Sequence, residues 1–118
     1  MENVKKYGFL AMMALTTFAF VAAGGMKLSG AEQMHASFGM MGLPIWFGYF
    51  IGACEIAGGI GIWVRKLSGL AAAGLFIIMA GAIYFHVNYT PISMAIPALV
   101  LAIFAAIIFV KRRKDILK

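Results

Sequence analysis

Glu55 is the residue of this chain whose type and position most suggest chemistry. It lies near the middle of an apolar run, 44–64, that is long enough to cross a membrane. A carboxylate at the centre of a bilayer costs a helix about 2.5 to 3.5 kcal/mol on insertion scales, so such residues usually face the protein interior, a partner or water. We favour a proton-binding or ligand-binding role. The alternative is a structural residue that fixes helix register through a hydrogen bond.

Two basic side chains, Lys27 and His86, are candidates to share a binding site with Glu55. Each follows the end of an apolar run, and both ends are expected on the outer side of the membrane. Glu55 lies 11 residues beyond Pro44, about 16 Å along a helix, so a direct pair requires Lys27 to reach inward by several ångströms. The alternatives are that Lys27 extends to the membrane surface and that His86 caps or anchors its helix.

Other side chains with metal or redox chemistry are few. Cys54 is the single cysteine, which excludes an internal disulfide and the CxxC chemistry of thiol oxidoreductases. The two histidines, His35 and His86, are too few and too far apart in sequence to indicate a metal site or a bis-histidine haem. We therefore predict no catalytic residue, no metal and no intrinsic cofactor.

Composition places these residues in a membrane protein. The chain has 118 residues, of which 64% are hydrophobic and 12% charged, and its mean hydropathy is +0.96. Four unbroken apolar runs have the length of membrane-spanning helices, about 17 to 25 residues: 7–24, 44–64, 67–84 and 92–110. We predict an all-α fold, in which one membrane domain, 1–118, forms an up-down bundle of four transmembrane helices with sequential neighbours. The segment 25–43 is expected to connect the first two spans on the outer side.

The basic residues predict the orientation of the bundle, because Lys and Arg are retained on the cytoplasmic side during insertion. Nine share one predicted face: Lys5, Lys6, Arg65, Lys66, Lys111, Arg112, Arg113, Lys114 and Lys118. Only Lys27 lies on the other face, so both termini are expected in the cytoplasm. The formal charge of +6 therefore requires no nucleic-acid partner, and anionic lipid headgroups are the expected contact of these residues.

The second apolar run has two distinct faces. Four glycines lie within roughly 60° of Glu55 around the helix axis, at about 100° per residue: Gly48, Gly52, Gly58 and Gly59. Bulky residues such as Trp46, Phe50 and Ile60 occupy the opposite face, where they can meet lipid. Small residues let helix backbones approach closely, so we expect Glu55 to project into a tight interface or a cavity.

Three further features leave alternatives open. The segment that contains Glu32 and His35 is either an interfacial helix that covers the mouth of a cavity or an ordinary connecting loop. Pro97 is predicted to kink the fourth span near Ser93. The first apolar run also resembles a secretory signal peptide, but we expect it to be retained, because its removal would leave an unpaired packing face.

Taken together, the motifs resemble the DoxX/DoxX-like family over nearly the whole chain. They are Gly25-Met26-Lys27-Leu28, Met41-Gly42-Leu43-Pro44, Gly52-Ala53-Cys54-Glu55-Ile56-Ala57-Gly58, Arg65 and His86. The resemblance implies a four-helix protein of the bacterial or archaeal cytoplasmic (inner) membrane. It also implies that Lys27, Glu55, Arg65 and His86 are the recurrent polar positions. Some relatives are associated with quinone-linked sulfur-compound oxidation or redox-defence complexes.

The leading functional prediction is a small membrane subunit that binds a hydrophobic molecule, a quinone or a lipid, near Glu55 and supports a redox enzyme partner. The thiosulfate:quinone oxidoreductase members of the family are larger or work with a second subunit, and this chain has no redox cofactor motif. An accessory subunit of a quinone-linked oxidoreductase is therefore favoured over independent catalysis. One alternative is a proton-coupled exporter acting as a homodimer, since small multidrug transporters share the length, the four spans and a single membrane-embedded Glu, although theirs is on the first helix. The other is a purely structural assembly subunit.

Overall fold

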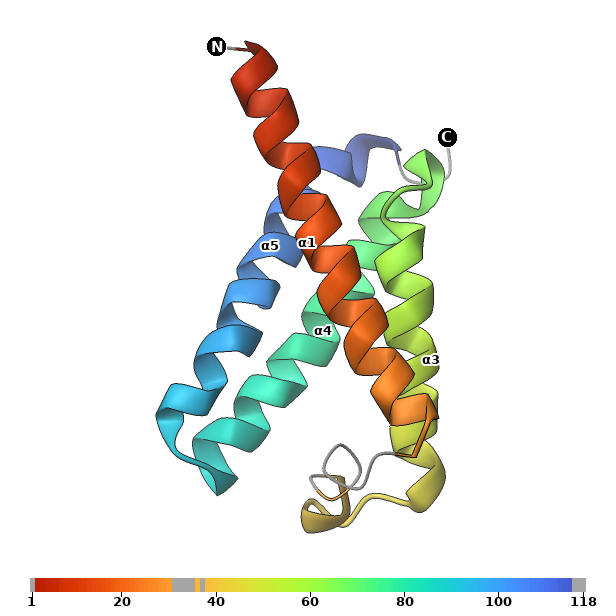
Figure 1. Ribbon diagram of the computed structural model, residues 1–118, viewed down its shortest axis with the longest axis vertical. Helices are drawn as coiled ribbons and strands as arrows, with labels where there is room; N and C mark the ends of the chain where they lie inside the picture. Colours follow the sequence, from red (N-terminus) through yellow and green to blue (C-terminus); the bar gives the residue numbers. More distant parts are fainter. Residues whose placement is uncertain (1, 31–35, 37, 116–118) are drawn as a thin grey trace.

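The computed structural model describes residues 2–30, 36 and 38–115, and most of these are helical (Figure 1). The α helices with described bounds are α1 (Glu2–Leu28), α3 (Ile45–Gly61), α4 (Arg65–Tyr89) and α5 (Ile96–Arg112). Two short 3-10 helices, η1 (Ile92–Ala95) and η2 (Arg113–Asp115), flank α5. The prediction of an all-α fold is confirmed.

The helices differ in length. α1 has 27 residues and α4 has 25, and both are long and apolar enough to cross a membrane. α3 and α5 have 17 residues each, at the lower end of the range of about 17 to 25. α3 is shorter than the predicted run 44–64 because tight turns replace α-helical bonding after Gly61, where the Trp63 and Val64 amides donate to carbonyls three residues back. The apolar character of α1 and α4 is that of a membrane protein, and the crossing by all four helices stays a prediction.

Successive helices run in opposite directions and pack as two pairs. α1 packs along α3, and α4 packs along α5, while smaller contacts between α3 and α4 and between α1 and α5 join the pairs (Figure 1). α1 begins and α5 ends at the same end of the molecule, which we call the basic end because Lys5, Lys66 and Lys111 lie there. The opposite end carries the α1–α3 connection and the turn between α4 and α5, and we call it the cavity end.

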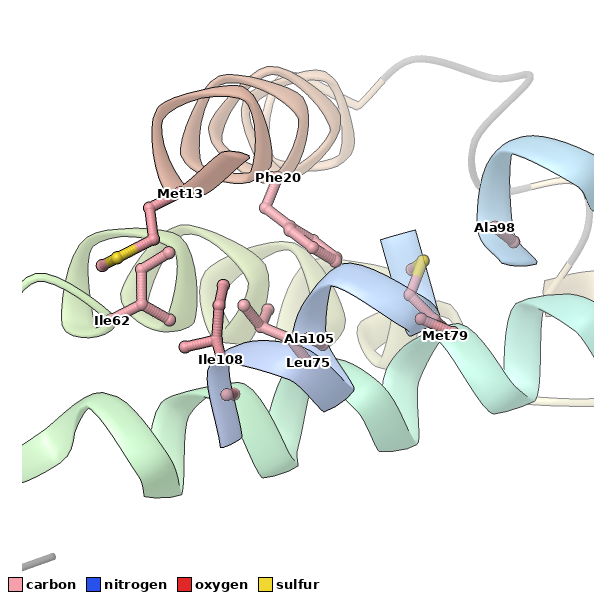
Figure 2. Close-up of a cluster of buried hydrophobic side chains, with 10 residues drawn as sticks. Met13, Phe20, Ile62, Leu75, Met79, Ala98, Ala105 and Ile108 are labelled. Atoms are coloured by element: carbon pink, nitrogen blue, oxygen red, sulfur yellow. The ribbon is translucent and has the colours of Figure 1, made fainter. Parts of the chain in front are cut away.

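The core lies between the two helix pairs. Figure 2 shows Met13 of α1 pointing toward Ile62, and Phe20 of α1 pointing into the space between the helices that Leu75 and Ile108 also enter. All of these are at most 1% exposed. The buried residues of α5 are otherwise alanines, at positions 98, 102 and 105. Their small side chains allow α4 and α5 to approach closely.

The outer surface of the helices is strongly apolar. Trp46, Phe50 and Ile60, which were predicted to face lipid, are 61%, 54% and 55% exposed. Large apolar side chains such as Phe18 and Ile103 are also exposed on the other helices. Extended apolar surface of this kind marks contact with a membrane or a partner, which fits the composition of the chain.

The prediction that Pro97 kinks the interior of a helix is wrong. α5 begins at Ile96, so Pro97 lies in its first turn, and the preceding segment Ile92–Ala95 is a 3-10 helix. Proline is tolerated in the first turn because the amide there has no intrahelical partner to lose. Pro97 therefore marks the start of the α helix.

Candidate functional site

Lys27 and Glu55 form a buried ion pair between α1 and α3. Lys27 Nζ lies 2.7 Å from Glu55 Oε1, and the two side chains are 11% and 2% exposed. Lys27 is in the last turn of α1, near the cavity end, whereas Glu55 is deeper along α3. Side chains tilt toward the N-terminus of their helix, and the N-terminus of α1 is at the far, basic end, so Lys27 points inward. This direction explains how Lys27 extends far enough inward to contact Glu55.

Two glycines bring the backbones of α1 and α3 together beside this pair. A Cβ atom on Gly24 would lie 2.5 Å from the carbonyl oxygen of Gly52, and a Cβ on Gly52 would lie 2.8 Å from Lys27 Cβ. Neither position has room for a larger residue without movement of the backbone. Gly52 was singled out from the sequence, whereas Gly24 was not, although its place in a Gly-Gly pair at the end of the first apolar run was a usable signal.

The other glycines of α3 contact different helices. Gly48 and Gly59 are buried, as are Gly52 and Glu55. A Cβ on Gly59 would lie 3.3 Å from Phe20 Cβ on α1, whereas a Cβ on Gly58 would lie 2.8 Å from Leu75 on α4. The glycine face of α3 is therefore divided between the two adjacent helices.

A cavity of about 710 Å³ lies next to the ion pair. Its walls come from α3, α4 and the connection that precedes α3, with Lys27 of α1 at one side. Along α3 the lining residues recur every fourth position, from Phe47 through Ile51 to Glu55, so they form one stripe on the helix surface. Most of the wall is apolar, and Glu55 is the deepest residue of this stripe.

His86 lies on the same cavity wall, on the last turns of α4. Its Nδ1 atom is 3.0 Å from the hydroxyl of Thr90, another lining residue, and the centre of its ring is 5.3 Å from the centre of the Phe85 ring, with the two rings nearly perpendicular. The structure thus brings Lys27 and Glu55 into direct contact and places His86 nearer the cavity end, held by Thr90.

The remaining predicted residues lie away from this cavity. Arg65 and Lys66 begin α4, and Lys111 and Arg112 end α5. The cationic groups of Lys111 and Arg112 lie 5.1 and 5.4 Å from the centre of the Phe9 ring. Arg113 and Lys114 follow in η2. All of these residues are at the basic end, so Arg65 is far along α4 from His86.

Some predictions concern other side chains. Cys54 is a free, half-buried thiol. Among the residues that the structure describes, no three His, Cys, Asp or Glu side chains lie close enough together to hold a metal ion. Glu32 and His35 lie outside the described residues. Phe38 and Met41 of the same segment are described, and they line the cavity together with Met40. Whether the segment covers the mouth of the cavity stays a prediction.

Thr17 is a polar contact between helices that sequence reasoning missed. Its hydroxyl donates to the carbonyl oxygen of Gly59 at 2.7 Å and accepts a hydrogen bond from Trp63 Nε1, also at 2.7 Å. Gly59 lies two residues before the end of α3, where carbonyl groups lack intrahelical partners. The signal was a pair of threonines, Thr16 and Thr17, inside an otherwise apolar run.

Comparison with known proteins gives one match. The model of the DoxX-like family matches residues 11–107, which include Lys27, Glu55, Arg65 and His86. No curated protein and no solved structure matches the chain.

Proposed function

Because the chain belongs to the DoxX-like family, we propose that this small membrane protein binds a hydrophobic ligand in the cavity beside Lys27 and Glu55. The protein crosses the bacterial or archaeal cytoplasmic membrane four times as a single domain, with both termini in the cytoplasm. The ligand is a quinone or a lipid, and the protein acts as an accessory subunit of a redox enzyme.

The observation that carries this proposal is the position of the ion pair on the wall of a large apolar cavity. Sites for small molecules are typically clefts of about 300 to 1,000 Å³, lined mainly by apolar side chains with a few polar groups that fix orientation. The cavity has about 710 Å³ and combines Phe47 and Ile51 with Lys27, Glu55 and His86. Its size and lining match those of a small-molecule site.

The polar side chains on the cavity wall would have different roles in binding such a ligand. The Lys27 ammonium can donate a hydrogen bond to a carbonyl oxygen, and its contact with Glu55 at 2.7 Å holds it in place. His86 offers a second polar group near the cavity end. A quinone would supply the redox chemistry when bound, while this chain would bind the ring, orient it and exclude water.

The ion pair weighs against the exporter, and the cavity weighs against a purely structural subunit. A proton-coupled exporter requires a carboxylate that exchanges protons, and Glu55 is already paired with a cation. A purely structural role would explain the pair but not the cavity next to it. Loss of dye export in Glu55→Gln would favour the exporter, and an unchanged phenotype with a stable co-purifying enzyme would favour the structural subunit.

Native mass spectrometry of the protein extracted gently from its own membrane tests the proposal. We expect the wild type to retain a quinone or lipid that Glu55→Gln loses. The matched control is Glu2→Gln, which makes the same change at an exposed residue at the basic end and should retain the ligand. Equal retention by wild type and Glu55→Gln would contradict the proposal, as would wild-type protein that carries no small molecule.

A further inference from the structure

The charges on the cavity wall are balanced in a way that restricts the ligand. Among the described lining residues, the acidic group is Glu55, and the basic groups are Lys27 and His86. The carboxylate of Glu55 already has a cation 2.7 Å away. The lining therefore carries no excess negative charge with which a positively charged ligand could pair.

The different exposure of the two charged side chains strengthens this restriction. The stem of Lys27 packs against Gly52, three residues nearer the cavity end than Glu55. Lys27 is also the more exposed partner, at 11% against 2% for Glu55. Of the two charged residues on the cavity wall, Lys27 is therefore the more accessible to a ligand.

Burial makes the balance of charge on the cavity wall important for selection. Charges in apolar surroundings interact strongly because water does not screen them, and like charges repel over short distances. A lipophilic cation would have to displace Lys27 or lie beside it without a counter-charge. A carbonyl or carboxylate head would instead accept a hydrogen bond from the ammonium group.

We infer that Lys27 makes this cavity selective for amphiphiles whose polar head accepts hydrogen bonds and carries no positive charge, and that it excludes lipophilic cations. This inference rests on the proposed function, because it requires the cavity to bind a ligand. It adds a chemical class to the ligand and assigns Lys27 as the residue that determines specificity.

Two probes with the same chain length and opposite charge test the inference: dodecanoate and dodecyltrimethylammonium. Binding of each is measured by native mass spectrometry as a function of probe concentration, with the protein in a neutral maltoside detergent. The wild type should bind dodecanoate more tightly. Lys27→Met removes the charge and leaves Glu55 as an unpaired anion, so it should shift the preference toward the cation by at least about tenfold, because a buried charge strongly favours a partner.

Two further variants control for global effects. Lys114→Met removes the same charge from an exposed residue at the basic end, and it should leave the preference unchanged. The double variant Lys27→Met/Glu55→Gln has no charge at either position, and it should bind both probes about equally. If Lys27→Met fails to fold, the double variant still tests the inference, because the inference requires the double variant to lose the wild-type preference for dodecanoate.

The outcomes separate the inference from the proposed function. A wild type that prefers the cation, or a preference that neither Lys27 variant alters, would overturn the selectivity while leaving the binding site in place. A shift of equal size in Lys114→Met would also overturn it, since net charge alone would then explain the result. Failure of the wild type to bind either probe saturably would overturn the binding site itself and the selectivity with it.

Discussion

At the scale of single residues, the molecule is defined by the few polar groups that its apolar helices bury. Lys27 and Glu55 form a buried pair, and the half-buried Thr17 of α1 contacts both the Gly59 carbonyl and Trp63 at the end of α3. Burying a polar group costs free energy unless a partner satisfies it. Each of these contacts therefore constrains how the helices fit together, and each can be tested by removing one partner.

The ion pair predicts a strong coupling between Lys27 and Glu55. Removing one member of a buried pair leaves an uncompensated charge and costs about 3 to 5 kcal/mol, whereas replacing both members by neutral groups costs much less. We expect Lys27→Met to lower the free energy of unfolding more than Lys27→Met/Glu55→Gln does. Unfolding by SDS in mixed micelles measures both. Additive effects of the two single changes would show that the charges are not coupled.

Thr17 and Thr16 form a matched pair for testing a hydrogen bond between helices. Thr17→Val removes the donor to Gly59 and the acceptor for Trp63, and it should cost about 1 kcal/mol, because such bonds in membranes contribute roughly 0.6 to 1.7 kcal/mol. Thr16 donates only within its own helix, to the Met12 carbonyl, so Thr16→Val should have a smaller effect. The same SDS titration compares them. An equal loss in both variants would remove the special role of Thr17.

At the scale of helices, the crossing of α1 and α3 determines where the site residues meet. Gly24 and Gly52 allow these backbones to touch, and the pair Lys27–Glu55 lies directly beside that contact. Because the inward direction of Lys27 follows from the direction of α1, a change in the crossing would separate the two charges. The site is thus a product of helix packing as much as of the residues themselves.

Adjacent glycines at the end of α1 provide a sharp test of this crossing. Gly24→Ala places a Cβ 2.5 Å from the Gly52 carbonyl oxygen, and overpacking of this kind costs about 1 to 3 kcal/mol. Gly25→Ala adds the same atom where nothing lies within 4 Å, and it should be neutral or stabilising by up to about 1 kcal/mol. Thermal unfolding in detergent and ligand retention measure the two variants. Equal behaviour would show that α1 and α3 do not meet at Gly24.

The sequence predicts different parts of this arrangement to different depths. The helical fold could be predicted because the apolar runs are long and unbroken, and the grouping of Glu55 with Gly52 and Gly59 follows from the helical period alone. The contact between Lys27 and Glu55 could not be predicted from the sequence, since it depends on how closely α1 approaches α3. The start of α5 at Ile96 was missed because a proline in an apolar run fits both a kink and a first turn.

At the scale of the whole molecule, the basic residues and the cavity lie at opposite ends. The start of α1, with Lys5, and the end of α5, with Lys111, are at the basic end. His86 and the connection before α3 are at the cavity end (Figure 1). If cytoplasmic retention of Lys and Arg orients the protein, the cavity is reached from the outer half of the bilayer. A ligand or partner enzyme would then act on that side.

Labelling of single cysteines tests this orientation directly. In a Cys54→Ala background, Asn88→Cys lies at the cavity end and Lys114→Cys at the basic end, and both native residues are exposed. A maleimide that cannot cross membranes should label Asn88→Cys in intact cells and Lys114→Cys only after permeabilisation. The reverse pattern would place the cavity toward the cytoplasm, and labelling of both sites in intact cells would mean that α5 does not cross. With the expected result, the cavity beside Lys27 and Glu55 lies toward the outer side of the membrane, so the proposed ligand would enter it from the outer leaflet.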